Sequence, residues 1–382
     1  MSSPPTSTAA VNGKEPSPET TFSSLPDDLV LNCLARLSRL HYPTLSLVSK
    51  RFRLLLASPD SPDLYTSRSL LHRTESCLYV CLRFPLDPNP RWFTLWRRPD
   101  RASVNREKPI CNLLVSIPSS PLPSARCSAL VAVGSHIYNI GGTIDDDEPS
   151  SRVLILDCRY HSWEEGPSMI MRRDHPAASV LDGKLYVAGG CKDIDSPNWI
   201  EVFEPKFKTW EAVSSSCAKE CDSEIIRSTE IDGKVYMCGS KGVSYNPKDG
   251  ICEPVEWNMC KGWAWFSSCV IDNVLYYYYS REFKWFDASI REWRIVQGLE
   301  SLDIAIHSHV KLADYGGKMA VFWDMTYASD SGGGFQGKQI WCAEVEVERN
   351  NNGEILGRVE LFGPVLEVPE GSEFVGVLAA TV

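Results

Sequence analysis

Two histidines, His307 and His309, come nearest in this chain to the spacing of a metal site. Residues two apart on an extended strand point to the same face, so both imidazoles could contact one ion. No second pair of ligands accompanies them, which favours a pair of core or channel histidines. The sequence also lacks the Gly-x-Ser-x-Gly nucleophile elbow and the His-Glu-x-x-His zinc motif. We therefore expect no catalytic residue, no metal and no other cofactor.

The cysteines suggest packing rather than chemistry. The chain has 14 of them without a Cys-x-x-Cys pair, whereas zinc clusters need closely paired thiolates. Most fall in apolar strand patterns, where a thiol behaves as a small hydrophobic side chain. We expect them to be reduced, buried and structural, which predicts a cytoplasmic or nuclear location.

Composition narrows the classes of partner. The 382 residues carry a net charge of −10, which argues against binding to nucleic acid. No apolar run reaches the length of about 18 residues that a membrane helix needs, so we expect no membrane span. The first residues lack the basic-then-apolar order of a secretory signal. With 43% hydrophobic residues and 12 Trp, the chain can bury a large core.

The N-terminal part divides into a tail and a small helical module. Residues 1–20 are rich in Ser, Thr and Pro, and we expect them to be a disordered tail. Ser24 can then cap a helix, Pro26 suits its first turn, and two aspartates complement its dipole. Apolar residues at helical spacing predict three short helices, so the module is assigned to residues 21–68, with a connector over 69–76.

This module has more leucine than its own core needs. Three short helices bury too little surface for secure independent stability, and surplus apolar side chains on a small module favour a partner that covers them. The alternative is that the bundle packs only on the following domain.

Residues 24–56 resemble an F-box. The resemblance rests on Leu-Pro followed by two acidic residues and Leu, and on the later Leu-x-x-Val-Ser-Lys-x-Phe-x-x-Leu, in which Ser49 and Phe52 replace the commoner Cys and Trp. It implies that the module binds the Skp-type adaptor of a cullin-based ubiquitin ligase. The adaptor-binding residues that it implies are Leu25, Pro26, Leu29, Leu34, Leu45, Val48, Ser49, Phe52 and Leu55.

The rest of the chain contains a degenerate repeat of about 40–50 residues. Its first mark is a turn, a Tyr and a double glycine, as in Gly134 to Gly142 and again in Asp182 to Gly190. Its second mark is an Asp, Glu or Asn followed six residues later by Trp, or by Cys252 in one unit. Each unit reads as four short strands, which is typical of a propeller blade. The double glycines with spaced Tyr and Trp resemble kelch repeats.

Counting the strands gives a closed ring of six blades. Five units lie between Arg126 and Pro364, two further strands lie upstream, and residues 374–382 form a lone strand at the C-terminus. We expect this last strand to complete the first blade, because closure removes exposed sheet edges. The predicted fold is therefore mainly β, a six-bladed kelch-type β-propeller over residues 77–382 preceded by a small three-helix F-box.

The two faces of such a ring should differ. Turns between the first and second strands and between the third and fourth are short, whereas the loops on the other face are long, and binding sites favour long loops on rigid scaffolds. Arginine and tryptophan often anchor protein interfaces. The substrate-binding candidates on this face are Arg126, Arg173, His175, Trp199, Arg227, Trp263 and Trp265. Each Arg could instead form a salt bridge at a blade edge, and each Trp could fill the space between blades.

The whole resembles plant F-box/kelch-repeat proteins. This resemblance implies a non-catalytic substrate receptor: the F-box binds the Skp-type adaptor and, through it, a cullin, while the propeller binds an unidentified substrate protein. Two alternatives stay open. One is a kelch interaction scaffold outside any ligase, and the other is a metal-dependent propeller enzyme.

Overall fold

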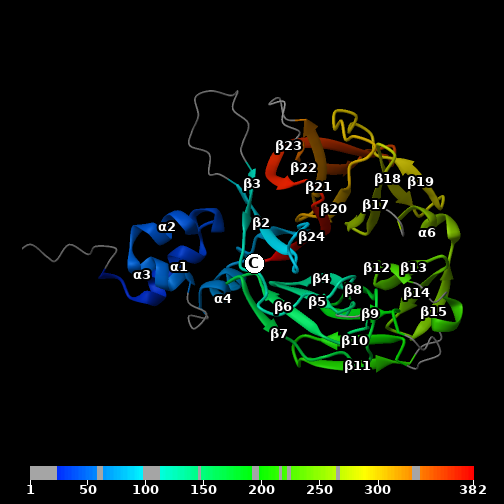
Figure 1. Ribbon diagram of the computed structural model, residues 1–382, viewed down its shortest axis with the longest axis horizontal. Helices are drawn as coiled ribbons and strands as arrows, with labels where there is room; N and C mark the ends of the chain where they lie inside the picture. Colours follow the sequence, from blue (N-terminus) through cyan, green and yellow to red (C-terminus); the bar gives the residue numbers. More distant parts are fainter. Residues whose placement is uncertain are drawn as a thin grey trace, which may run out of the picture. The chain divides into compact units, whose positions relative to one another are not determined.

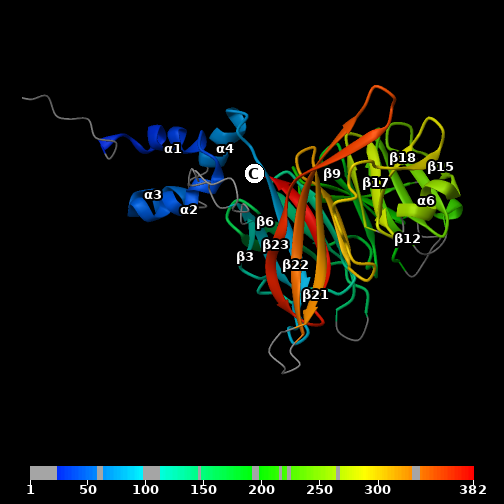
Figure 2. The same ribbon diagram turned by 90° about the horizontal axis from the view of Figure 1, so that it is seen from above.

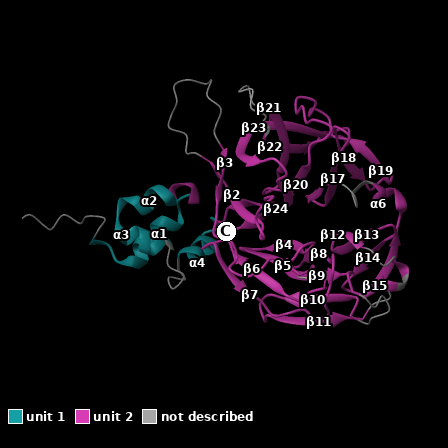
Figure 3. Cartoon of the chain, in the orientation of Figure 1, with its two compact units in different colours: residues 1–38, 42–73 teal, residues 39–41, 74–382 magenta. Residues whose placement is uncertain are grey.

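The computed structural model describes residues 24–57, 63–97, 112–144, 148–191, 198–214, 217–221, 225–263, 267–328 and 336–382. The tail expected over residues 1–20 lies outside these ranges. The chain divides into two compact units, residues 1–38 with 42–73, and residues 39–41 with 74–382 (Figure 3).

The first unit consists of short helices. They are α1 (Asp27–Ala35), α2 (Tyr42–Val48), α3 (Lys50–Ala57) and α4 (Asp63–Leu70), and the 3-10 helix η2 (Arg39–His41) belongs to the second unit. Pro26 takes the N-cap position of α1, with Asp27 and Asp28 in the first turn, where carboxylates complement the helix dipole. Ser49 caps α3, because its Oγ accepts a hydrogen bond of 3.1 Å from the backbone N–H of Phe52.

The core of the helical unit joins α1 to α4. Its buried apolar side chains are Val30, Leu31, Leu34, Ala35, Tyr42, Leu56, Leu64 and Tyr65. Arg68 is also fully buried, and its guanidinium donates to the carbonyls of Leu37 and Arg73 and to the Tyr42 hydroxyl. The unit thus extends to Arg73, whereas the sequence placed the module's end at residue 68.

The second unit is a six-bladed propeller, and the predicted fold class is confirmed. Figure 1 shows the sheets around a common axis, with β4, β8, β12, β20 and β24 toward the centre and β7, β11, β15 and β19 outside. The first three blades contain β24 (Glu373–Thr381), β1 (Ser76–Arg83), β2 (Arg91–Arg97) and β3 (Asn112–Ser116); β4 (Ala129–Val133), β5 (His136–Ile140), β6 (Val153–Asp157) and β7 (Ser162–Glu165); and β8 (Ala177–Leu181), β9 (Lys184–Ala188), β10 (Ile200–Glu204) and β11 (Thr209–Val213).

The other three blades follow the same order. They contain β12 (Ile225–Ile231), β13 (Lys234–Gly239), β14 (Gly242–Asn246) and β15 (Ile251–Val255); β16 (Ser268–Ile271), β17 (Val274–Tyr279), β18 (Glu282–Asp287) and β19 (Glu292–Ile295); and β20 (Val310–Asp314), β21 (Met319–Ala328), β22 (Gln336–Arg349) and β23 (Ile355–Pro369). Helix α5 (Cys217–Glu220) precedes the fourth blade and α6 (Trp257–Trp263) follows it. Figure 2 shows the long strands β22 and β23 of the last blade from the side.

The two ends of the propeller sequence meet in one sheet. Strand β24 pairs antiparallel with β1 from Ser76 opposite Thr381 to Arg83 opposite Glu373. The first blade therefore takes its innermost strand from the C-terminus, as the strand count indicated. This pairing closes the ring without an unpaired strand between the first and last blades.

Glycines sit where the repeat needs unusual backbone geometry. Asp182 and Gly183 both have positive φ, which is the two-residue turn that matches the twist of a β-hairpin. The second glycine of each pair permits close packing: a Cβ on Gly142 would lie 2.2 Å from the carbonyl oxygen of Arg126, and one on Gly190 would lie 2.0 Å from that of Asp174. The double-glycine mark therefore reflects backbone crowding.

The tryptophan mark joins the second, third and fifth blades to the connections that precede them. Trp163 Nε1 donates to the carbonyl of Pro118 at 2.9 Å, Trp210 Nε1 to that of Pro167 at 2.8 Å, and Trp293 Nε1 to that of Asn258 at 2.8 Å. In the fourth blade Cys252 stands at this position and forms a disulfide with Cys217, which also lies in the connection before its blade. A covalent bond there replaces the tryptophan hydrogen bond.

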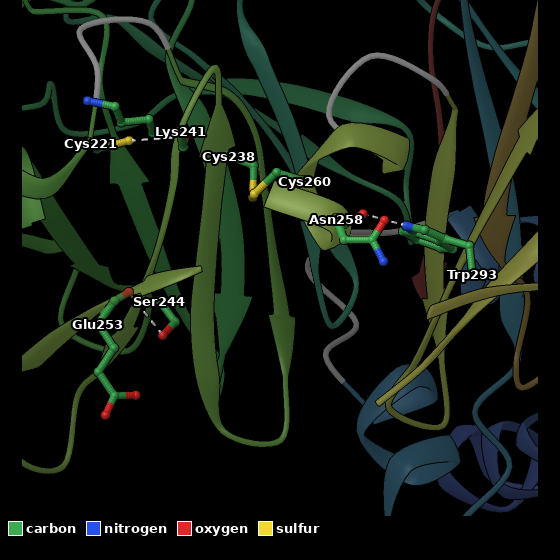
Figure 4. The surroundings of a disulfide bond; sticks show 8 residues. All are labelled: Cys221, Cys238, Lys241, Ser244, Glu253, Asn258, Cys260 and Trp293. Carbon is green, nitrogen blue, oxygen red and sulfur yellow. Dashed lines mark hydrogen bonds between the residues drawn. A yellow bond between two sulfur atoms is a disulfide. The ribbon is translucent and has the colours of Figure 1, made fainter. Parts of the chain in front are cut away.

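A second disulfide also involves the fourth blade, and the two together correct the expectation that the cysteines are reduced. The second disulfide joins Cys238 on β13 to Cys260 on α6, beside Asn258 and Trp293 (Figure 4). Gly242 leaves the space for it, because a Cβ there would lie 2.3 Å from the Cys260 sulfur. Some of the other cysteines follow the expectation: Cys81 and Cys342 are buried, and burial raises the pKa of both. Cys33 and Cys127 do not, because both are exposed.

Three further observations bear on the expectations drawn from the sequence. His307 and His309 precede β20 rather than lying on a strand, so their side chains do not share a sheet face. Within the described ranges, no group of three or more His, Cys, Asp or Glu side chains is placed to hold a metal ion. None of the helices in those ranges combines the length and apolar character needed to cross a membrane.

Candidate protein-interaction surfaces

The helical unit exposes large apolar side chains on every one of its first three α-helices. Val48 and Leu47 on α2 are 67% and 77% exposed, and Leu54 on α3 is 68% exposed. We call the following set the apolar surface of the helical unit: Leu29, Leu37, Leu47, Val48 and Leu54. Such side chains gain free energy when a partner removes them from water, at about 25 cal/mol per Å².

The predicted adaptor-binding residues divide into three groups. Pro26, Leu29 and Val48 are exposed. Half-buried positions between the helices are occupied by Leu25, Leu45, Ser49, Phe52 and Leu55. The third group is Leu34 alone, which is only 2% exposed.

Leu34 is the one adaptor-binding candidate that the helical unit itself buries, so its assignment is corrected. Its side chain belongs to the core between the helices, and its carbonyl accepts a 3.1 Å hydrogen bond from the Tyr42 hydroxyl. Ser49 also has a local role, as the cap of α3. Both residues therefore have structural roles within the helical unit.

Leu47 and Leu54 are prominent surface residues that the sequence reasoning did not select. The signal was present, because Leu54, Leu55 and Leu56 are consecutive on α3. Consecutive residues on a helix point about 100° apart, so the three cannot all face one core. Leu56 is buried, Leu55 is half-buried and Leu54 faces outward.

The propeller face with the blade connections has long loops in some blades only. The segments 141–152 and 189–199 join the second and third strands in two blades, as expected. In the next two blades β13 to β14 and β17 to β18 turn within very few residues. On the opposite face, where short turns were expected, residues 98–111 separate β2 from β3. We call the side with the blade connections the connection face.

Arg173 is a structural residue, not a surface anchor. Its side chain is 0% exposed and pairs with the equally buried Glu201 at 2.9 Å. The guanidinium also donates to the carbonyls of Gly189, Asn198 and Trp199. Glu201 in turn accepts the backbone N–H groups of Ile170 and Met171. The salt-bridge alternative was correct here, because every polar group of this buried pair has a partner.

Trp199 is likewise a core residue. It is 3% exposed and packs in an apolar cluster that includes Ile200 and Val235. The side chain of Trp263 and the whole of Trp265 lie outside the described residues.

Arg126 and His175 remain on the connection face. Both are exposed, and Arg126 exchanges backbone hydrogen bonds of 2.8 Å with Thr143 at the base of a long loop. His175 Nδ1 lies 2.5 Å from an Asp174 carboxylate oxygen. Exposed apolar side chains accompany them on this face, including Leu86 at 96% and Ile306 at 72%.

Arg227 differs from the other two arginines in its place along the chain. It lies within β12 and pairs with Cys238, whereas Arg126 and Arg173 precede their inner strands. Its side chain lines a cavity of about 320 Å³ together with Lys311 of β20. This cavity adjoins the starts of the inner strands, which is the end nearest the connection face.

An ionic cluster around the buried Asp324 of the last blade involves His309. The side chains of His307 and His309 are exposed, so they are not the core or channel pair that the sequence favoured. The backbone N–H and the Nδ1 of His309 contact the Asp324 carboxylate at 2.7 and 2.9 Å, and Lys338 Nζ donates to the same carboxylate at 2.9 Å. Burial alone would raise the pKa of Asp324, but the hydrogen bonds from Lys338 and His309 outweigh it, so the pKa is lowered. The cluster neutralises one buried charge and resembles a structural ion pair more than a reactive site.

Comparison with known proteins agrees with both units. The model of the F-box domain matches residues 22–63, and that of the FKB95 kelch-repeats domain matches residues 92–366. The Arabidopsis thaliana F-box/kelch-repeat protein At4g39550 is 50% identical over 100% of both chains. F-box/kelch-repeat protein At4g39580 of the same plant is 51% identical over 96% of both chains. The chain, with its helical unit and its closed kelch propeller, therefore belongs to the F-box/kelch-repeat family.

Proposed function

We propose that this protein is the substrate-recognition subunit of an SCF-type cullin ubiquitin ligase. The F-box binds the Skp-type adaptor and through it a cullin, and the kelch propeller binds a target protein for ubiquitination. The subunit has no catalytic residue of its own and acts by proximity, because holding two reactants together removes much of the entropic barrier to their reaction. A cytoplasmic or nuclear location is part of this proposal and follows from the proposed ligase role, because the two disulfides remove reduced cysteines as an argument for it.

The apolar surface of the helical unit is the observation that carries the proposal. Val48, Leu47 and Leu54 are each at least two-thirds exposed, which is unfavourable for a unit that must remain in water. A partner that covers these side chains accounts for their exposure. The F-box family membership supports an adaptor in that role.

The connection face supports the substrate-binding half of the proposal. It combines exposed Arg126 and His175 with exposed apolar side chains such as Leu86 and Ile306. Mixed surfaces of this kind suit protein partners, whose interfaces have an apolar centre and a polar rim. Loops of different length in different blades can give each family member its own specificity.

Binding to the adaptor tests the first half. Full-length protein should retain a recombinant Skp-type adaptor in a pull-down, and Leu25→Ala combined with Pro26→Ala should weaken the retention. A matched control is Leu86→Ala, which removes an equally apolar side chain from the propeller. If the double variant and the wild type retain equal amounts of adaptor, the docking assignment is wrong.

Affinity purification from plant cells separates this function from its alternatives. A receptor copurifies with adaptor and cullin, and its substrates accumulate when a variant without the F-box residues 22–63 is expressed. A kelch scaffold outside the ligase would bring down neither ligase subunit. A metal-dependent enzyme would contain stoichiometric copper or iron by elemental analysis.

A further inference from the structure

The propeller has a cavity on its axis. It has a volume of about 320 Å³, and residues from the inner strands of all six blades line it, from β4, β8, β12, β16, β20 and β24. The volume lies at the lower end of the range for small-molecule sites, about 300–1,000 Å³. The cavity therefore has room for a small metabolite or a single protruding group.

Two cationic side chains, Arg227 and Lys311, give this cavity its charge. They line it from β12 and β20, and no carboxylate is among its described lining residues. In the hairpin register, Arg227 takes the place that Ala129 and Ala177 hold in the second and third blades. A cation thus stands where the second and third blades have a methyl group.

Neither cation has an ion-pair partner among the residues that the structure describes. The Arg227 Nε is buried and has no hydrogen-bond partner there. Burial lowers the pKa of Lys311 to about 8, and the nearby positive charge of Arg227 contributes to this shift. A buried donor without a partner is costly, so an arrangement of this kind favours an anion that supplies the missing acceptor.

Hydroxyl groups around the cations extend the set of possible donors. Ser228 donates to Ser179 at 2.9 Å, and Ser267 accepts the backbone N–H of Leu312 at 2.7 Å, so these two are already engaged. Ser128, Thr229 and Ser268 also line the cavity. Hydroxyls beside an Arg and a Lys are the donors that hold phosphate and carboxylate oxygens in proteins.

We propose that the axial cavity of the propeller is a binding site for a small oxyanion of the phosphate or carboxylate class, held between Arg227 and Lys311. The inference is independent of the ligase function, because it uses only residues of the propeller. The oxyanion is either a free small molecule or a group carried by a bound protein, and both share the same chemistry.

Calorimetric titration of the full-length protein tests this site. The probes are inorganic phosphate, pyrophosphate and citrate at constant ionic strength. We expect one saturable site in the wild type. Binding should be about 10–100-fold weaker in Arg227→Gln and in Lys311→Met, because each substitution removes one charge-assisted hydrogen bond. The controls are Arg172→Gln and Lys248→Met, which remove exposed cations of the same propeller and should change the affinity less than about twofold.

Two further variants separate loss of the site from loss of the fold. Arg227→Lys and Lys311→Arg keep the charge, and we expect them to retain measurable binding. Thermal melting of each variant checks that the propeller is folded. Titration with a phosphoserine or glutamate peptide, and competition with pyrophosphate, shows whether a protein-borne group reaches the same site.

The proposal is overturned by either of two results. One is the absence of saturable binding for all three anions by the folded wild-type protein. The other is binding that the control variants weaken as much as Arg227→Gln does, because the anion would then bind the general surface charge.

Discussion

At the scale of single residues, Arg173 and Arg227 show how one residue type takes two roles in neighbouring blades. Arg173 meets a buried carboxylate and three carbonyls, so its charge is fully compensated. Arg227 faces an axial cavity whose lining includes another cation. The sequence placed both among surface candidates, because strand periodicity does not show which residue of another strand lies opposite an arginine.

Removing Arg173 should therefore cost stability. We expect Arg173→Ala to lower the free energy of unfolding by about 3–5 kcal/mol, because Glu201 would remain buried without its counter-charge. Urea denaturation measures this change. The neighbouring Arg172 is exposed, and Arg172→Ala should stay within about 0.5 kcal/mol of the wild type. Equal effects of the two substitutions would contradict the structural role of Arg173.

Lys311 should have the opposite effect on stability. Its pKa of about 8 in the folded protein lies below that of a solvated lysine, about 10.4, so the unfolded chain binds its proton more tightly. The charge of Lys311 therefore destabilises the folded state below pH 8. This cost disappears as the pH rises from the pKa of the folded group toward the pKa of the unfolded group.

We expect Lys311→Met to raise the free energy of unfolding by about 1–3 kcal/mol at pH 7 and by much less at pH 10. Urea denaturation at both pH values gives the difference between variant and wild type. Among the cavity-lining residues the other titratable groups are Arg227 and Cys269, and burial keeps the Cys269 thiol protonated by raising its pKa. A variant less stable than the wild type at pH 7 would show that Lys311 has a partner that holds its charge.

At the scale of elements, the repeat marks predicted the blades well because each mark has a local physical cause. The Asp-Gly turns require positive φ, and the outer-strand tryptophans reach the connection of the preceding blade. The mark at Cys252 was visible in the sequence as a missing tryptophan. Its disulfide to Cys217 was not predictable, because the pairing depends on where the connection before the fourth blade folds.

The Cys217–Cys252 bond should contribute to stability under oxidising conditions. We expect Cys252→Ser to lower the free energy of unfolding by about 2–4 kcal/mol in the oxidised protein. The reductant dithiothreitol should lower the melting temperature of the wild type more than that of this variant. If the reductant shifts both by the same amount, this bond does not stabilise the fourth blade.

The first three α-helices of the first unit were also predictable in place, but their faces were not. The proline and the two aspartates mark where α1 begins, although Pro26 rather than the expected Ser24 takes its N-cap position. The cap of α3 by Ser49 was not predicted. Which leucines point outward depends on how α1 packs against α4, and the spacing of apolar residues in the sequence does not show this packing. Leu34 was therefore assigned to the surface although it lies in the core.

At the scale of the whole molecule, the closure of the propeller depends on its last strand. The pairing of β24 with β1 is the only one in the described sheets that joins strands from opposite ends of the chain. Deletion of residues 373–382 should therefore remove a cooperative thermal transition of the propeller rather than weaken one blade. A matched truncation cannot be made inside the ring, so the control is deletion of residues 1–20, which should leave the transition unchanged. An unchanged melting temperature after the C-terminal deletion would contradict the closure.

The account as a whole is tested most directly by the affinity of full-length protein for a Skp-type adaptor, measured by calorimetry for the wild type, Val48→Asp and Leu86→Asp. Val48 belongs to the apolar surface of the helical unit, whereas Leu86 is an exposed apolar residue of the propeller. A charge on a surface that the adaptor covers should weaken binding at least about 30-fold, and Leu86→Asp should leave it unchanged. Equal affinity of all three proteins, or no binding by the wild type, would contradict the proposal that the helical unit binds the adaptor.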